Sequence, residues 1–292
     1  MFKISELLKK SEETSNLMPT LIADSSILTR HVLNGLHSTR FAGKGDNFWQ
    51  FKDYKFGDNV AEIDWRKSAS INKLLTREKE NETSKVLYFY YDRSKSMVFK
   101  SRGPHNKYYF AALISLTLAR IFIKNKENVY LFNDKKIPVK CIHNLKNYSK
   151  NFLLQDTDNS FPNEQLLKQD SFLFIFSDFF YENINLEKYI LNLRKKNITG
   201  QLIQILDPLE INFNIGENVR LTDMENQQST LLSNSKDIKD SYNNKLQIHI
   251  EEIKEITKKY NWQYMLYSTD TNLNIFLLKL LKDIIIKKIK IN

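Results

Sequence analysis

The alternation of apolar strands with helical segments from residue 86 onward constrains the fold of this chain most strongly. VLYFYYD (86–92) and SFLFIFSD (171–178) are apolar at nearly every position, whereas a strand with one solvated face alternates. Strands buried on both faces and separated by helices predict a doubly wound, mostly parallel α/β sheet covered on both sides. The expected strands are 86–92, 128–132, 171–178, 199–207 and 262–269, and the expected helices are 108–124, 186–196, about 241–260 and 273–289.

Two parts of the chain depart from this alternation. Residues 1–82 begin with an amphipathic helical segment and continue as a polar, aromatic stretch without clear periodicity. We expect them to form an N-terminal appendage on an α/β domain spanning 83–292. Residues 208–235 contain two short extended stretches, INFNI and NVRLTDM, which predict a hairpin-like insertion at the sheet edge. Both parts are too short and too polar to bury a core of their own.

The composition predicts a soluble protein, and its positive net charge is compatible with anionic binding partners. Lys and Arg number 44 against 34 Asp and Glu, a net charge of +10, but the basic residues are scattered. The single cysteine, Cys141, excludes an intrachain disulfide and fits a reducing compartment. The start of the chain lacks a secretory pattern, and lysines interrupt the apolar segment 273–289. We therefore expect a cytoplasmic protein without membrane insertion.

Polar side chains follow two of the apolar strands at the point where each ends. Asp92, Ser94 and Ser96 come at alternate positions after the first strand, and Asp178 closes another. Because parallel strands end at one edge, the two carboxylates converge if their strands are neighbours. Oxygen ligands of this kind suit Mg²⁺, with Mn²⁺ or Ca²⁺ as alternatives. In a purely structural alternative, the serines cap the following turn and the aspartates satisfy loop amides.

These residues resemble a known family. The D-x-S-x-S pattern of Asp92, Ser94 and Ser96 resembles the metal-ion-dependent adhesion site of von Willebrand factor A domains, and FSDFF resembles the distal aspartate of that site. HSTRFAGKGDNFWQFKDYKFGDNVAEIDWRKSASINKLLTREKE (37–80), with its G-D-x-x-x-x-I-D-W-R block, resembles the signature of the domain of unknown function 58 family. Members of that family carry a von Willebrand A-like domain.

The resemblance implies a binding role rather than an enzymatic one. Family members are thought to work with MoxR-type AAA+ ATPases in the maturation of client proteins or the insertion of metals and cofactors. In such adhesion sites an acidic side chain of the partner completes the shell of the cation. The usual threonine in a Gly-Thr context is missing here, and Thr157 or Ser160 is the nearest substitute. A degenerate, metal-free form of the site stays open.

The G-D-x-x-x-x-I-D-W-R block has two interpretations. As a docking surface it would combine aromatic anchors with charged side chains, the mix that interface centres prefer. As a set of structural staples, the same residues would cap turns, form ion pairs and hold the appendage together. The residues concerned are Arg40, Trp49, Tyr54, Asp58, Asp64, Trp65 and Arg66.

Two other function classes remain as alternatives. A metal-dependent hydrolase would also place aspartates at strand ends, but Asp92-Arg93-Ser94 lacks the second carboxylate of a D-x-D pair. A nucleic-acid-binding protein would use the positive charge, but no recognised nucleic-acid motif is present. The chain also lacks a P-loop and a G-x-S-x-G elbow. We therefore expect a partner-binding module and no enzyme.

Overall fold

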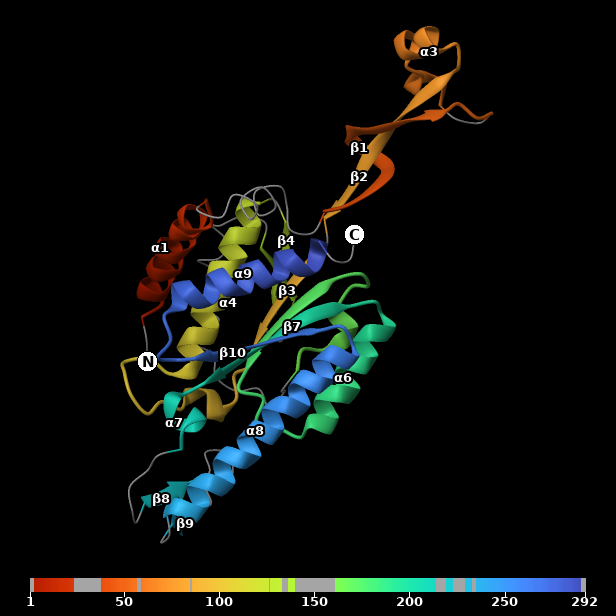
Figure 1. Ribbon diagram of the computed structural model, residues 1–292. Coiled ribbons are helices and arrows are strands. Elements are labelled where there is room, and N and C mark those ends of the chain that lie inside the picture. The colour runs from red at the N-terminus through yellow and green to blue at the C-terminus, as the bar shows by residue number, and fades with distance from the viewer. Residues whose placement is uncertain are drawn as a thin grey trace. The chain divides into compact units, whose positions relative to one another are not determined.

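The computed structural model divides the chain into two compact units, which are described separately (Figure 1). Met1–Leu36 together with Val86–Asn292 form the first unit, and His37–Lys85 form the second. The structure describes residues 3–23, 38–56, 59–84, 86–125, 127–132, 136–139, 161–213, 219–222, 229–232 and 235–289.

A six-stranded sheet forms the centre of the first unit, with strand order β10-β7-β6-β3-β4-β5. The strands are β3 (Val86–Tyr91), β4 (Asn128–Phe132), β5 (Lys136–Val139), β6 (Phe172–Ser177), β7 (Thr199–Leu206) and β10 (Gln263–Ser268). All neighbouring pairs are parallel except β4 and β5, which are antiparallel. The predicted doubly wound, mostly parallel α/β fold is therefore confirmed. The edge strand β5 was not predicted, because four residues that include Pro138 carry little strand signal.

Helices cover both faces of the sheet, as the two-faced apolar strands require. They are α1 (Ile4–Ala23), α4 (Lys107–Lys124), α6 (Asn183–Lys195), α8 (Ser235–Lys259) and α9 (Leu273–Ile289). Along β3, Leu87 and Phe89 join the core beneath α1, α4 and α9, while Tyr88 and Tyr90 join the core beneath α6 and α8. The helical segments predicted from periodicity are thus present, with ends shifted by a few residues.

The amphipathic helix α1 packs on the sheet unit. Its Leu7 lies in the core, and the Nε of Arg120 in α4 donates a 3.1 Å hydrogen bond to the Oγ of Ser11. The predicted appendage covers residues 1–82, whereas in the structure the separate unit is His37–Lys85. Helix α1 belongs to the sheet unit because its apolar side is buried against α4.

The second unit is built on a long antiparallel pair that the sequence did not reveal. β1 (Ser38–Asp53) pairs with β2 (Leu75–Ser84), and the register shifts between Gly43 and Gln50. Between the strands lie the 3-10 helix η1 (Val60–Glu62) and the short helix α3 (Trp65–Ile71). Neither strand shows the apolar–polar alternation by which a half-buried strand is usually recognised.

In the described residues of the segment predicted as an insertion at 208–235, the structure has one helical turn and one strand pair. α7 (Pro208–Ile211) follows β7, and β8 (Val219–Thr222) pairs antiparallel with β9 (Ser229–Leu232) in a sheet of its own. NVRLTDM supplies β8 as expected, but the partner strand is STLL rather than INFNI. Ile211 of INFNI instead ends α7, whose start is fixed by Asp207 and Pro208.

The closing helix α9 is the predicted apolar segment. Its Leu277, Leu280 and Leu281 are buried in the core, while Lys282 is exposed. Among the helices in the described part of the chain, none has both the length and the apolar character needed to cross a membrane.

Candidate functional site

The strand order brings Asp92 and Asp178 to one edge of the sheet. Numbered in chain order within this sheet, the strands run 3-2-1-4-5-6, and the order reverses between β3 and β6. These two strands are hydrogen-bonded parallel neighbours, with Tyr91 paired to Phe176. Asp92 follows β3 and Asp178 follows β6. Both carboxylates therefore lie at the topological switch point, where α/β folds of this kind bind ligands.

Asp92 is held from both sides and is only 3% exposed. Its Oδ1 accepts a 2.8 Å hydrogen bond from the backbone N–H of Ser94, and its Oδ2 accepts a 2.6 Å bond from the hydroxyl of Ser177. Burial, followed by repulsion from Asp178, raises the pKa of the Asp92 carboxyl, and the hydrogen bonds from Ser177 and Ser94 oppose that rise. The ionised form is thus costly in the ion-free protein, and a nearby cation would favour it.

Ser94 and Ser96 turn their hydroxyls toward each other. Ser94 precedes the 3-10 helix η2 (Lys95–Val98), yet its side chain makes no capping hydrogen bond. The two Oγ atoms instead lie 2.9 Å apart. Two adjacent ligands of an octahedral Mg²⁺ are about 2.9 Å apart, since each metal–oxygen distance is about 2.0–2.1 Å. The hydroxyl pair therefore fits two neighbouring positions around such an ion, and the alternative in which Ser94 caps the turn is not realised.

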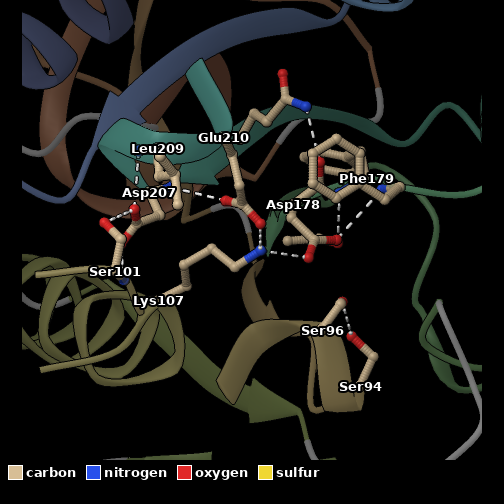
Figure 2. Close-up of polar contacts among 12 residues, drawn as sticks. Ser94, Ser96, Ser101, Lys107, Asp178, Phe179, Asp207, Leu209 and Glu210 are labelled. Atoms are coloured by element: carbon tan, nitrogen blue, oxygen red, sulfur yellow. Dashed lines mark hydrogen bonds and ion pairs between the residues drawn. The ribbon is translucent and has the colours of Figure 1, made fainter. Parts of the chain in front are cut away.

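Asp178 sits in a tight turn after β6 that the sheet itself supports. The next residue, Phe179, has a left-handed backbone with φ +56°, and the N–H of Phe180 donates to Oδ1 of Asp178 at 3.2 Å. Gln204 of β7 donates from Nε2 to the carbonyl of Asp178 at 2.7 Å, and the Tyr264 hydroxyl donates to Oε1 of Gln204 at 2.5 Å. This chain of bonds fixes the backbone of the turn. The carboxylate of Asp178 points toward the ammonium group of Lys107 (Figure 2).

Lys107 supplies a cation that sequence reasoning missed. It is the first residue of α4 and is 0% exposed. Its Nζ lies 2.8 Å from Oδ2 of Asp178 and 2.6 Å from Oε1 of Glu210, as Figure 2 shows. A lysine at a helix start does not indicate a functional site by itself, although acidic residues are preferred at that position. Nothing in the local sequence indicates its burial.

Glu210 reaches Lys107 from the capping box of α7. The Oε2 of Glu210 accepts a 2.8 Å bond from the N–H of Asp207, and Oδ1 of Asp207 accepts a 2.9 Å bond from the N–H of Leu209. Ser101 adds a bond from its N–H to Oδ2 of Asp207 at 2.9 Å and another from its hydroxyl to Oδ1. Burial raises the pKa of Glu210, and Lys107 opposes the rise.

Asp207 is a third aspartate that directly follows a parallel strand, in this case β7. It is buried, and it shares the sheet edge of Asp92 and Asp178. The same signal that singled out those two, an aspartate closing an apolar strand, could have identified it in QILD. Its carboxylate accepts hydrogen bonds from Leu209 at the start of α7 and from Ser101. Asp207 therefore has a structural role, which is to hold the start of α7.

The described residues fit a divalent ion in part. In the described part of the chain, no group of three or more His, Cys, Asp or Glu side chains is placed to hold a metal ion. An ion would therefore rest on the hydroxyls of Ser94 and Ser96, with Asp92 and Asp178 acting through water. Thr157 and Ser160 lie outside the described residues.

The predicted docking residues belong to the second unit. Asp64 caps α3, since its Oδ1 accepts a 3.0 Å bond from the N–H of Lys67. Tyr54 is half-buried, whereas Trp65 and Arg66 of α3 are exposed, Trp65 to 62%. Asp58 and the side chains of Arg40 and Trp49 in β1 lie outside the described residues. The structure thus gives Asp64 the structural role and leaves Trp65 and Arg66 on the surface.

Taken together, the fold and the site define a doubly wound α/β protein whose switch point gathers hydroxyl, carboxylate and ammonium groups. The chain belongs to the family described as "Protein of unknown function DUF58", whose model matches residues 50–252. This match confirms the predicted family. A comparison with curated proteins finds no match.

Two solved structures are similar to this chain. The first is the conserved hypothetical protein BatB from Bacteroides thetaiotaomicron, 12% identical with a TM-score of 0.41, covering 71% of this chain and 100% of that chain. The second is an aerotolerance-related membrane protein from Bacteroides fragilis NCTC 9343 with multiple mutations to serines, 13% identical with a TM-score of 0.40, covering 70% of this chain and 99% of that chain.

Proposed function

We propose that this protein is a non-enzymatic, cytoplasmic binding adaptor that works with a MoxR-type AAA+ ATPase in the maturation or remodelling of other proteins. The observation that carries the proposal is the convergence of Asp92, Ser94, Ser96 and Asp178 at the switch point between β3 and β6. The chain belongs to the DUF58 family, and the choice of partner rests on the role that this family resemblance implies. Ligands of doubly wound sheets bind at this edge.

A divalent cation is the proposed cofactor, with Mg²⁺ first and Mn²⁺ or Ca²⁺ as alternatives. Ser94 and Ser96 would hold it through their half-exposed hydroxyls, while Asp92 and Asp178 lie behind them as buried negative charge. When bound, the ion supplies a positive charge at which an acidic side chain of the partner can complete the coordination shell. The buried carboxylates favour such a cation, because burial and mutual repulsion make the ionised Asp92 costly without one.

The serine pair favours recognition over bond cleavage. A nucleophilic serine needs a base within hydrogen-bond reach. The Oγ of Ser94 lies 2.9 Å from the Oγ of Ser96, a hydroxyl that cannot act as that base at neutral pH. Both carboxylate oxygens of Asp92 already accept a hydrogen bond, Oδ1 from the backbone N–H of Ser94 and Oδ2 from the Ser177 hydroxyl.

A second docking surface is proposed at α3 of the second unit. Five large apolar side chains between residues 56 and 74 are exposed: Phe56, Val60, Trp65, Ile71 and Leu74. Exposed aromatic side chains with a neighbouring arginine are typical interface anchors, and Arg66 adjoins Trp65. Trp65 and Arg66 would contact the partner, whereas Asp64 maintains the helix start.

A pull-down with a MoxR-type AAA+ ATPase of the same organism tests the proposed function. The tagged full chain is incubated with the purified ATPase in Mg²⁺, in Mn²⁺, in Ca²⁺ and in a chelator. Retention in the presence of a divalent ion and its loss in the chelator are expected. Failure to retain the ATPase under any condition would contradict the proposed partner, and equal retention in the chelator would contradict the proposed ion.

A further inference from the structure

The ammonium group of Lys107 is shared between carboxylates on two different elements. Asp178 belongs to the turn after β6, and Glu210 belongs to α7, 71 and 103 residues away in the sequence. The Lys107 side chain is 0% exposed. A buried ammonium group requires anionic partners close by, because removing it from water is costly. The two carboxylates meet that requirement from different sides.

One of these partners, Asp178, is also the second carboxylate of the proposed ion site. A divalent ion drawing on Asp178 would lie close to an ammonium that is 2.8 Å from its Oδ2. Two positive charges within a few ångströms of each other repel strongly where water screens little, as in a buried environment. The two cations therefore compete for the negative charge of Asp178, and Lys107 weakens the attraction of this carboxylate for an ion.

The other partner, Glu210, is anchored independently of Asp178. Its Oε2 accepts the bond from Asp207 N–H that completes the capping box of α7, and Ser101 holds Asp207 in turn. The Oε1 of Glu210 already lies 2.6 Å from Nζ of Lys107. Lys107 can thus give up Asp178 and remain paired with Glu210.

We infer that Lys107 is a built-in competitor of the divalent cation, and that ion binding is favoured when its ammonium leaves Asp178 for Glu210 alone. This inference rests on the proposed function, since it concerns the same site. The ion-free protein keeps Asp178 neutralised by its own lysine, and the apparent affinity for the ion is reduced by the fraction of molecules in that state. A partner that depends on the ion then binds only when the ion concentration is high enough to displace Lys107.

Titration of MgCl₂ into the chelator-stripped full chain tests the inference by isothermal calorimetry. The double variant Lys107→Gln/Glu210→Gln has the net charge of the wild type and removes both members of the pair. We expect it to bind Mg²⁺ about tenfold more tightly than the wild type, because the competitor is gone. Lys95→Gln is the control, since it removes an exposed positive charge located between Ser94 and Ser96. Its affinity should change less than about twofold, because water screens an exposed charge.

Glu210→Gln alone should have the opposite effect. Lys107 then has only Asp178 as a partner, so Mg²⁺ should bind more weakly than in the wild type. Equal Mg²⁺ affinity of the wild type and the double variant would overturn the inference and leave the proposed ion intact. Tighter binding by Glu210→Gln would also overturn it. Absence of Mg²⁺ binding in both the wild type and the double variant would overturn the inference together with the proposed cofactor.

Discussion

The hydroxyl of Ser177 donates a 2.6 Å hydrogen bond to Oδ2 of Asp92 and so joins the ends of β6 and β3 at the switch point. Ser177 also accepts a 2.9 Å bond from the N–H of Phe179, which ties the same hydroxyl to the turn that carries Asp178. The two central strands and the two site aspartates are thus linked through one serine. This link fixes the Asp92 carboxylate although its ionised form is disfavoured.

Asp92→Asn should stabilise the ion-free protein at neutral pH. The pKa of Asp92 is raised in the folded state, so the folded state holds this proton more tightly than the unfolded state does. Stability is therefore lost as the pH rises from the unfolded pKa through the raised folded value. Asparagine resembles the protonated acid and avoids that loss. Thermal midpoints in a chelator should be higher for the variant at pH 7, and the difference should shrink at pH 4.5. A lower midpoint at pH 7 would contradict this interpretation.

Gly200→Ala should destabilise the fold severely. Gly200 of β7 pairs with Leu173 of β6, and an added Cβ would lie 2.2 Å from the Leu173 carbonyl oxygen and 2.6 Å from the Trp262 ring. Backbone cannot move aside without breaking the β6–β7 ladder. We expect a loss of more than about 3 kcal/mol in the free energy of unfolding, beyond the usual cost of overpacking, because the clash is with backbone. Urea denaturation measures it.

Gly103→Ala is the control for that measurement. Gly103 lies outside the sheet with φ +78°, and nothing lies within 4 Å of an added Cβ. Its cost should be limited to backbone strain of about 1–2 kcal/mol. A Gly200→Ala protein no less stable than Gly103→Ala would show that β6 and β7 are packed less closely than described.

Trp65→Ala should weaken partner binding without affecting stability. The side chain is 62% exposed on α3, so its removal leaves no cavity. As an interface anchor it should contribute at least about a tenfold change in affinity for the ATPase or client. Ile275→Ala, on an equally exposed side chain of α9, is the matched control. Unchanged affinity of Trp65→Ala in surface plasmon resonance would remove α3 from the proposed docking surface.

The central sheet could be predicted because its strands are apolar on both faces and its helices have clear periodicity. Leu87 and Tyr88 enter opposite cores although they are adjacent in sequence, which is why the whole run is apolar. β1 and β2 could not be predicted, since their polar residues follow no alternation. The packing of α1 on the sheet unit could not be predicted either, because it depends on contacts between residues far apart in sequence. Arg120 and Ser11, for example, are 109 residues apart.

The site was predictable where its residues follow a strand end, Asp92 and Asp178 directly and Ser94 and Ser96 in the D-x-S-x-S pattern that begins at Asp92. Asp92 and Asp178 could be placed at one edge from their strand-end positions, and Asp207 carries the same signal. Lys107 could not be found this way, because its partners Asp178 and Glu210 are distant in sequence and its burial comes from the surrounding fold. A charged residue at a helix start is ordinarily assumed to be exposed.

The affinity of Asp92→Asn for the MoxR-type ATPase in saturating Mg²⁺ tests the central claim most directly. Asp270→Asn is the matched control, because Asp270 follows the parallel strand β10 at the same edge but is exposed. If the switch-point site binds the partner through an ion, Asp92→Asn should weaken binding at least about tenfold, because it removes buried negative charge that favours the ion. Asp270→Asn should bind as the wild type does and keep its thermal midpoint, and Asp92→Asn should remain folded. Wild-type affinity of a folded Asp92→Asn protein in Mg²⁺ would contradict the account.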